Sequence, residues 1–144
     1  MAKDVLTKEN IHLNQSLNSK EEAVRYTGKI LADNGYVQEA YIDKMLERED
    51  VTSTFMGNYV AIPHGTEDAR DLVQETGLSV LTVPDGVDFD GNTVKVLIGI
   101  AGKENEHLDV LSKIAIVCAE EENIQKIVDA TSEEEIINLF DEVN

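Results

Sequence analysis

Cysteine and long apolar runs are scarce in this sequence, and each scarcity excludes a class of protein. The chain has one cysteine, Cys118, so it cannot form an intramolecular disulfide and is not a disulfide-stapled secreted scaffold. No uninterrupted apolar stretch approaches the roughly 20 residues that a membrane-spanning helix needs, and the N-terminus, MAKDVLTKEN, lacks the apolar region of a signal peptide. We therefore expect a soluble, cytoplasmic protein.

Basic residues are few, and the chain is strongly acidic. Lysine and arginine together number 12 against 29 aspartates and glutamates, which gives a formal net charge of −17 at pH 7. Such a charge repels the phosphate backbone of a nucleic acid and an anionic membrane surface, and it attracts a protein that carries a basic face. We expect protein partners and no nucleic acid.

The common metal and nucleotide motifs are also absent. The sequence contains no HExxH, CxxC or His-x-His, and no GxxxxGK[ST] or GxGxxG, because Gly102-Lys103 is followed by Glu104. Cys118 falls on the apolar stripe of a predicted helix, which is typical of a buried and inert thiol. We therefore expect neither a metal ion nor a cofactor.

The length and composition fit one compact domain over residues 1–144. A chain of 144 residues is long enough to bury one hydrophobic core and too short for two ordinary ones. Hydrophobic residues make up 42% and charged residues 28%, which is the balance of an ordinary globular protein.

Apolar periodicity and turn residues divide the chain into helices and strands. Capping boxes open helices at Ser19 and Ser132, and Asn105 is a suitable N-cap for another. The sequence predicts a turn at Pro84–Gly86 and a reversal at Asp90–Asn92. The predicted helices are 19–33, 38–48, 105–119, 121–130 and 132–140, and the predicted strands are 9–13, 59–62, 77–83, 87–89 and 94–102. This mixture predicts an α/β (mixed α+β) fold, with a mixed parallel and antiparallel sheet of about five strands flanked by helices on both faces.

A histidine follows the short apolar run Tyr59–Ile62 in the segment NYVAIPHGT. Pro63 has no N–H and favours the end of a strand's hydrogen-bond ladder, so we expect His64 at an edge of the sheet. Gly65 lets backbone N–H groups approach a ligand, and Thr66 adds a hydroxyl, so these residues suit an anion next to the imidazole. An inert histidine in a surface turn is the simpler interpretation, because a Pro-His-Gly triplet alone is a weak signal.

A second histidine, His107, lies in the first turn of the helix predicted from Asn105. It falls on the same stripe as Leu111, Ile114 and Cys118, which faces the core. The positive end of the helix dipole favours a neutral ring and a nearby anion at this position. The strand-to-helix connection before His107 is also a common place for sites in α/β sheets. A buried histidine with a purely structural hydrogen bond is the alternative.

Three segments occur in an order that resembles a known family. They are MLERE at 45–49, GNYVAIPHGT at 57–66 and IGIAGKENEHLDVLSKIA at 98–115. Together they resemble the type-2 IIA components of the bacterial sugar phosphotransferase system, the mannitol/fructose class. The resemblance extends over nearly the whole chain, and the combination of motifs is specific to this class.

The resemblance implies a phosphocarrier, that is, a phosphotransferase component with a phosphohistidine intermediate. A phosphoryl group would arrive from phosphorylated HPr, rest on a histidine nitrogen and leave to a cysteine of the IIB component, while the membrane component IIC imports the sugar. By motif position His64 would be the phosphorylated nucleophile, through Nε2, and Arg48 and His107 would be the other catalytic residues. A neutral imidazole can attack phosphorus, and a guanidinium can direct two donors toward the phosphate.

The resemblance also implies a phosphate-binding role for Gly65, Thr66 and Asn58. Some mannitol relatives have a glutamate six residues before the histidine, where this chain has Asn58. An asparagine can donate or accept a hydrogen bond but has no charge, so we expect it only to orient other groups.

Sugar and role each have alternatives. MLERE and the chain length favour mannitol, but fructose-type and nitrogen-regulatory relatives share the Pro-His-Gly core. A regulatory module, in which a partner reads the phosphorylation state of the histidine, is a second hypothesis. A hydrolase with His64 as general base beside Glu67 or Asp68 is a third, although nothing in the sequence positions a nucleophile for it.

Overall fold

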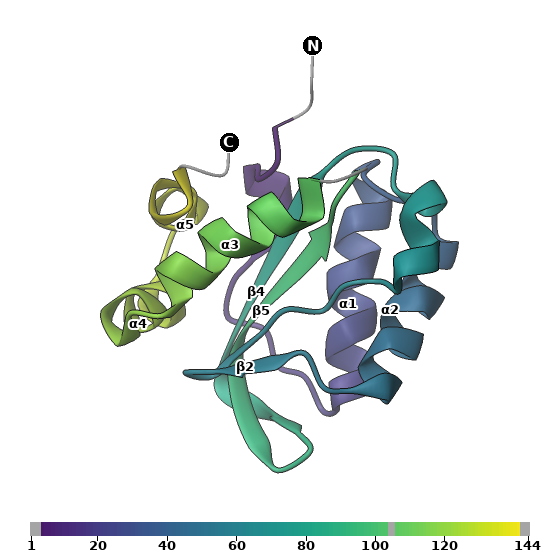
Figure 1. The fold of residues 1–144 in the computed structure, drawn as a ribbon. Coiled ribbons are helices and arrows are strands. Elements are labelled where there is room, and N and C mark those ends of the chain that lie inside the picture. The colour runs from purple at the N-terminus through teal and green to yellow at the C-terminus, as the bar shows by residue number, and fades with distance from the viewer. Residues whose placement is uncertain (1–3, 104–105, 142–144) are drawn as a thin grey trace.

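A five-stranded sheet forms the middle layer of the computed structural model, which describes residues 4–103 and 106–141 (Figure 1). The strand order is β1-β4-β5-β3-β2, where β1 is Ile11–His12, β2 Phe55–Gly57, β3 Val60–Ala61, β4 Gly77–Phe89 and β5 Asn92–Ala101. The central pair β4–β5 is antiparallel, and so is β2–β3, whereas β1 pairs parallel with β4 and β3 parallel with β5. The predicted mixed sheet is confirmed.

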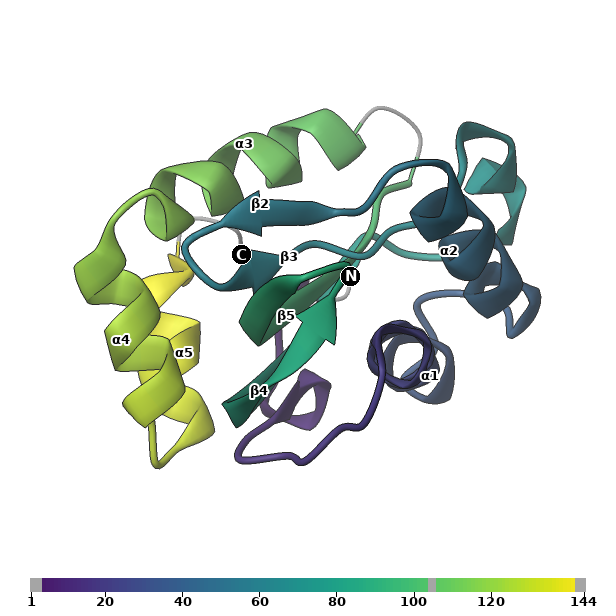
Figure 2. The ribbon, with the colours of Figure 1, turned by 90° about the horizontal axis from the view of Figure 1, so that it is seen from below.

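Helices lie on both sides of this sheet (Figure 2). There are also two short 3-10 helices, of which η1 precedes β1 and η2 lies between β3 and β4. The α-helices are α1 Lys20–Asp33, α2 Ala40–Val51, α3 Glu106–Cys118, α4 Glu121–Asp129 and α5 Glu133–Leu139, and the 3-10 helices are η1 Lys8–Asn10 and η2 Glu67–Leu72. No helix in the described part of the chain is long and apolar enough to cross a membrane.

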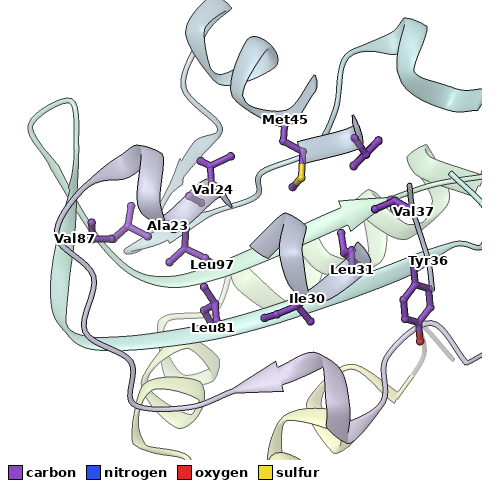
Figure 3. Close-up of a cluster of buried hydrophobic side chains, with 14 of the residues drawn as sticks. Ala23, Val24, Ile30, Leu31, Tyr36, Val37, Met45, Leu81, Val87 and Leu97 are labelled. Carbon is purple, nitrogen blue, oxygen red and sulfur yellow. The ribbon is translucent and has the colours of Figure 1, made fainter. Parts of the chain in front are cut away.

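The central strands contribute to two clusters of buried hydrophobic residues, one on each face of the single sheet. Leu81 and Leu97 pack with residues of α1 and α2 such as Val24 (Figure 3). Val80 and Ile98, the neighbours of the first two along the chain, pack with residues of α3, α4 and α5. Successive strand residues point to opposite faces, so a sheet covered on both sides requires the nearly continuous apolar sequence of β5.

The predicted starts of two helices are confirmed. Ser19 caps α1 by accepting the N–H of Glu22 at 3.1 Å, and a complete capping box joins Ser132 to Glu135 at α5. The predicted N-cap Asn105 lies outside the described residues.

The predicted turn at Pro84–Gly86 is wrong, because β4 continues through these residues to the hairpin at Asp90-Gly91. The pairing with β5 shifts in register between Thr82 and Val87, so the residues between them bulge out of the ladder. Proline lacks an N–H and Gly86 has a φ of 83°, and both properties suit an irregular segment.

Two predicted strands are shorter than expected. The segment 9–13 contributes only β1, because a 3-10 turn precedes it. The run 59–62 contributes only β3, since Asn58 and Tyr59 have φ values of 50° and 67° and form the turn from β2. His64 therefore follows a very short strand, and contacts outside this strand must hold it in place.

Candidate functional site

One pocket brings together most of the residues that the sequence identified. Its wall is formed by α2, the loop after β3, η2, the end of β5 and the start of α3. The lining residues are Tyr41, Arg48, His64, Gly65, Thr66, Glu67, Arg70, Val73, Gly102, His107 and Leu108. Because β3 and β5 are parallel neighbours, their carboxyl ends meet at one edge of the sheet, which is where α/β sheets commonly bind ligands.

His64 is tied to the end of β5 through the backbone. The carbonyl oxygen of Pro63 accepts the N–H of Ile100 at 2.9 Å, and His64 forms an isolated parallel bridge with Ile100. These contacts extend the β3–β5 pairing past the proline. The position of His64 at an edge of the sheet is thus confirmed, and it is the edge formed by strand ends.

One ring nitrogen of His64 forms a hydrogen bond within the protein. Nδ1 lies 2.8 Å from the carbonyl oxygen of Ile62, and a carbonyl only accepts, so Nδ1 carries the hydrogen. Burial lowers the pKa of His64, and Arg48 lowers it further, while the Ile62 bond and the carboxylate of Glu49 oppose this shift. The ring is therefore neutral near pH 7, with its lone pair on Nε2.

His107 lies beside His64 on the opposite wall. The two ring centroids are 5.1 Å apart with an interplanar angle of 67°. The pKa of His107 is lowered by burial and by the proximity of His64 and Arg70. A Cβ on Gly102 would lie 2.4 Å from Cα of His107, so glycine is required for α3 to begin this close to β5.

Two of the three arginines of the chain line this pocket, in a protein with a net charge of −17. Arg48 donates to the carbonyl oxygen of Thr52 at 2.7 Å, which holds its guanidinium at the end of α2. Arg70 was not identified from the sequence, where it stands between acidic residues. Its side chain has no ion pair or hydrogen bond to the residues that the structure describes. The third, Arg25, pairs with Glu21 on α1.

Gly65 and Thr66 line the pocket, but the N–H of Gly65 and the hydroxyl of Thr66 have partners in the protein. The N–H of Gly65 donates to the hydroxyl of Tyr41 at 2.9 Å, and this hydroxyl donates to the carbonyl oxygen of Ile100 at 3.0 Å. A Cβ on Gly65 would lie 2.6 Å from the tyrosine ring, so packing against Tyr41 explains the glycine. The Thr66 hydroxyl donates to Asp68.

Asn58 is not among the residues that line the pocket. Its side-chain amide donates to the carbonyl oxygen of Cys118 at 3.2 Å, at the C-terminus of α3. The amide thus satisfies one of the carbonyls left free at a helix end. This contact is structural, and the orienting role of Asn58 near a phosphate stays a prediction. Burial raises the pKa of the Cys118 thiol to about 12, so the thiolate is disfavoured.

Glu49 was missed because it stands in the charged run 47–50, where the sequence predicted the helix to end. The helix continues to Val51, and Glu49 is only 4% exposed. It follows Tyr41 and Met45 at intervals of four residues, so extending the apolar stripe of α2 would have placed it inward. No group of three histidine, cysteine or acidic side chains within the described residues could hold a metal ion.

Comparisons with known proteins find similar chains over nearly the whole length of the sequence. The family model for the phosphoenolpyruvate-dependent sugar phosphotransferase system, EIIA 2, matches residues 4–143. The mannitol-specific phosphotransferase enzyme IIA component of Bacillus subtilis is 60% identical over 141 residues, which cover 97% of this chain and 99% of the relative. The corresponding component of Geobacillus stearothermophilus is 59% identical over 145 residues, covering 100% of both chains.

A solved structure extends the comparison to a complex. The chain superposes with a TM-score of 0.88 and 35% identity on a structure from Escherichia coli, with 95% of this chain and 97% of the other covered. That structure is a complex of enzyme IIA-mannitol and phosphorylated enzyme IIB-mannitol.

Proposed function

Since this chain belongs to the EIIA 2 family of the phosphoenolpyruvate-dependent sugar phosphotransferase system, we propose that it carries a phosphoryl group on Nε2 of His64. The observation that carries the proposal is the hydrogen bond of 2.8 Å between Nδ1 of His64 and the Ile62 carbonyl oxygen. It leaves Nε2 as the nitrogen with the free lone pair, on a neutral ring in a pocket that two arginines line. A neutral nucleophile surrounded by cationic donors is what phosphoryl transfer requires.

The proposed partners are two proteins and, indirectly, a membrane component. Phosphorylated HPr is the donor, and the IIB component is the acceptor, as supported by the Escherichia coli complex with phosphorylated IIB. IIB would pass the group to a sugar alcohol imported by IIC. Mannitol is the favoured substrate, because both relatives that are about 60% identical are named mannitol-specific. This role places the chain on the cytoplasmic side of the membrane.

The transfer is an in-line displacement at phosphorus. Nε2 of His64 donates its lone pair to form the new P–N bond, while the bond from phosphorus to the leaving atom of the donor breaks and its electron pair returns to the donor. In the second transfer, the nucleophile of IIB forms the new bond to phosphorus. The P–Nε2 bond breaks, and its electron pair returns to Nε2 of His64. Because Nδ1 stays bonded to the Ile62 carbonyl, the ring keeps its orientation through both transfers.

Three pocket side chains are placed to stabilise the transferred group. Arg48 lies on the His64 side and affects the pKa of His64, whereas Arg70 affects the pKa of His107. Each guanidinium can direct two N–H donors at the equatorial oxygens, and a neutral His107 can donate one more hydrogen bond. A carrier must also release the group, so partial neutralisation is more useful than tight binding.

The proposal is tested by labelling the protein from phosphorylated HPr that carries a radioactive phosphoryl group. We expect one acid-labile, base-stable phosphoryl group per chain, and its complete loss in His64→Ala. The matched control is His12→Gln, because His12 lies on β1 and bonds the Tyr26 hydroxyl at 2.8 Å, away from the pocket. Full labelling of His64→Ala would overturn the assignment.

The sugar is tested separately with a panel of purified IIB domains. We expect the fastest transfer from the phosphorylated chain to a mannitol-specific IIB. Faster transfer to a fructose-specific IIB would replace the substrate, and failure with every IIB domain would favour the regulatory role.

A further inference from the structure

A buried carboxylate that the transfer step does not use lies next to the site. Glu49 is 4% exposed, and both of its oxygens accept hydrogen bonds from Thr54. Oε2 accepts the backbone N–H at 2.7 Å and Oε1 the hydroxyl at 2.6 Å. Within residues 4–103 and 106–141, no lysine, arginine or histidine forms an ion pair with it. An unpaired buried charge is costly, so these two short bonds have to compensate for the lost hydration.

A continuous series of hydrogen bonds leads from this carboxylate to the ring of His64. The carbonyl oxygen of Thr54 accepts the N–H of Ile62 at 3.1 Å. The carbonyl oxygen of Ile62 in turn accepts Nδ1–H of His64 at 2.8 Å. Ile62 is therefore held by Thr54 through its N–H, and it holds the imidazole of His64 through its carbonyl oxygen.

We propose that Glu49 is a positioning residue for His64, which acts through Thr54 and Ile62 to hold the ring as the Nδ1–H tautomer. The function of this arrangement in transfer rests on the proposed phosphorylation of His64. When phosphorus bonds to Nε2, positive charge develops on the ring, and a nearby negative charge stabilises it. Glu49 is the acidic group that favours the charged form of His64, against the effect of Arg48.

The chemistry of Thr54 explains why a carboxylate is required. Thr54 presents two donors, and an ionised carboxylate provides two acceptor oxygens without any donor of its own. Glutamine has the same shape but one oxygen, so its NH₂ group would face one of the Thr54 donors. Glu49→Gln is therefore expected to shift Thr54 and, with it, the Ile62 carbonyl.

The test separates positioning from simple stabilisation of the turn. The nitrogen chemical shifts of the His64 ring, measured by NMR at a pH where the ring is neutral, report the tautomer directly. We expect wild type to be almost entirely the Nδ1–H form and Glu49→Gln to show a measurable fraction of Nε2–H. Thr54→Val, which removes only the hydroxyl donor, is expected to give a smaller change in the same direction, and Thr54→Ser none.

The matched control is Glu135→Gln. Glu135 also accepts backbone N–H groups, from Thr131 at 2.8 Å and Ser132 at 3.0 Å, but it caps α5 away from the pocket. We expect this variant to lose stability and keep the wild-type His64 shifts. Wild-type shifts in folded Glu49→Gln and Thr54→Val would overturn the proposal.

A kinetic measurement adds the functional consequence. Transfer from phosphorylated HPr is expected to slow by about tenfold in Glu49→Gln, the lower end of the loss seen when a partner that orients a metal-bound histidine is removed. A slower rate with unchanged ring shifts would also overturn the positioning role. If the wild-type chain accepts no phosphoryl group, the proposed function fails, whereas the NMR measurement still decides whether Glu49 controls the tautomer.

Discussion

The two histidines of the pocket are held in very different ways. On the His64 wall, Ile62 is bonded to Thr54, Pro63 to β5 and Gly65 to the Tyr41 side chain of α2, and the His64 ring is bonded through Nδ1. On the opposite wall, His107 stands in the first turn of α3 and packs against Gly102. The ring of His107 has a contact with His64 but no hydrogen bond among the residues that the structure describes.

This difference separates the tasks of the two rings. A nucleophile benefits from a fixed orientation, because small misplacement in an in-line reaction is costly. A group that only donates a hydrogen bond to a phosphate can adjust to the phosphate as it arrives and leaves. We therefore interpret the His64 wall as one that fixes the orientation of the His64 ring, and the His107 wall as one that lets the His107 ring adjust to the phosphate. Perturbing each wall in turn tests this interpretation.

The largest effect is expected from removing the cation on the His64 wall. Arg48→Ala should slow transfer from phosphorylated HPr by about 100-fold, because a preorganised charged donor to the transferred group is lost. Arg48→Lys should recover part of the rate, since lysine keeps the charge without the planar fork. Pre-steady-state labelling measures both rates.

The matched control is Arg25→Ala, which breaks an exposed pair with Glu21 on α1 and leaves the pocket intact. It should transfer at the wild-type rate. An Arg48→Ala variant as fast as Arg25→Ala would exclude Arg48 from the reaction.

The next effect comes from loosening the backbone of the His64 wall. Tyr41→Phe removes the acceptor of the Gly65 N–H and the donor to the Ile100 carbonyl, and both groups are buried. The free energy of unfolding should fall by about 2 kcal/mol, the cost of leaving buried polar groups unsatisfied. Urea denaturation measures this change, and an unaltered midpoint would show that the tyrosine acts only by packing.

The same tyrosine gives a signature at alkaline pH. Burial raises its pKa to about 12, with the Gly65 bond acting in the opposite direction. The unfolded state therefore loses the proton first, so this contribution to stability is complete below about pH 10 and is lost as pH rises toward 12. Tyr41→Phe should show a weaker decline over that range than wild type.

The third test displaces the His107 wall, that is, the start of α3. In Gly102→Ala the new Cβ would lie 2.4 Å from Cα of His107, so the start of α3 must shift away from β5. We expect transfer to slow by about tenfold, since one hydrogen bond to the phosphate would be displaced. The His64 ring shifts should stay at their wild-type values. A changed His64 tautomer would show that the two walls are not independent.

Local features of this fold were predictable from the sequence, and features that depend on distant contacts were not. Ser19 and Ser132 cap helices through bonds to residues three positions away, so the sequence contains the whole motif. The bulge in β4 depends on its register with β5, and Gly65 is explained by Tyr41, 24 residues earlier. The motifs identified most of the pocket, but not its second arginine, Arg70.

Glu49 shows most clearly why the rest was missed. Its sequence neighbours are charged, which favours a solvated helix end, and its burial depends on Thr54 folding back over the helix terminus. A charged residue is rarely buried, so composition argues against such a position. The functional meaning of the residue appears only when its bonds are followed to His64.

The smallest effect is expected from the change of stability with pH. This effect depends on the pKa values of the two histidines, and a different arginine influences each of them. Burial is the main cause that lowers the pKa values of both His64 and His107. Arg48 lowers the pKa of His64 further, and His64 and Arg70 lower the pKa of His107 further. Because unfolded histidines bind protons before these two do, the free energy of unfolding should decrease as pH falls below about 6.5. The midpoint temperature of thermal unfolding should decline modestly as the pH is lowered from 7 to 5. The decline is modest because both rings keep partial contact with solvent.

Titration of each ring by NMR makes this test specific to one wall. Arg48→Gln should raise the pKa of His64 and leave that of His107 nearly unchanged, because only the first ring has Arg48 among its influences. Arg70→Gln should do the reverse. If either substitution shifted both rings equally, the arginines would act as one diffuse positive field. Separate shifts would mean that each histidine has its own cation, as expected for a pocket in which a fixed nucleophile faces an adjustable donor.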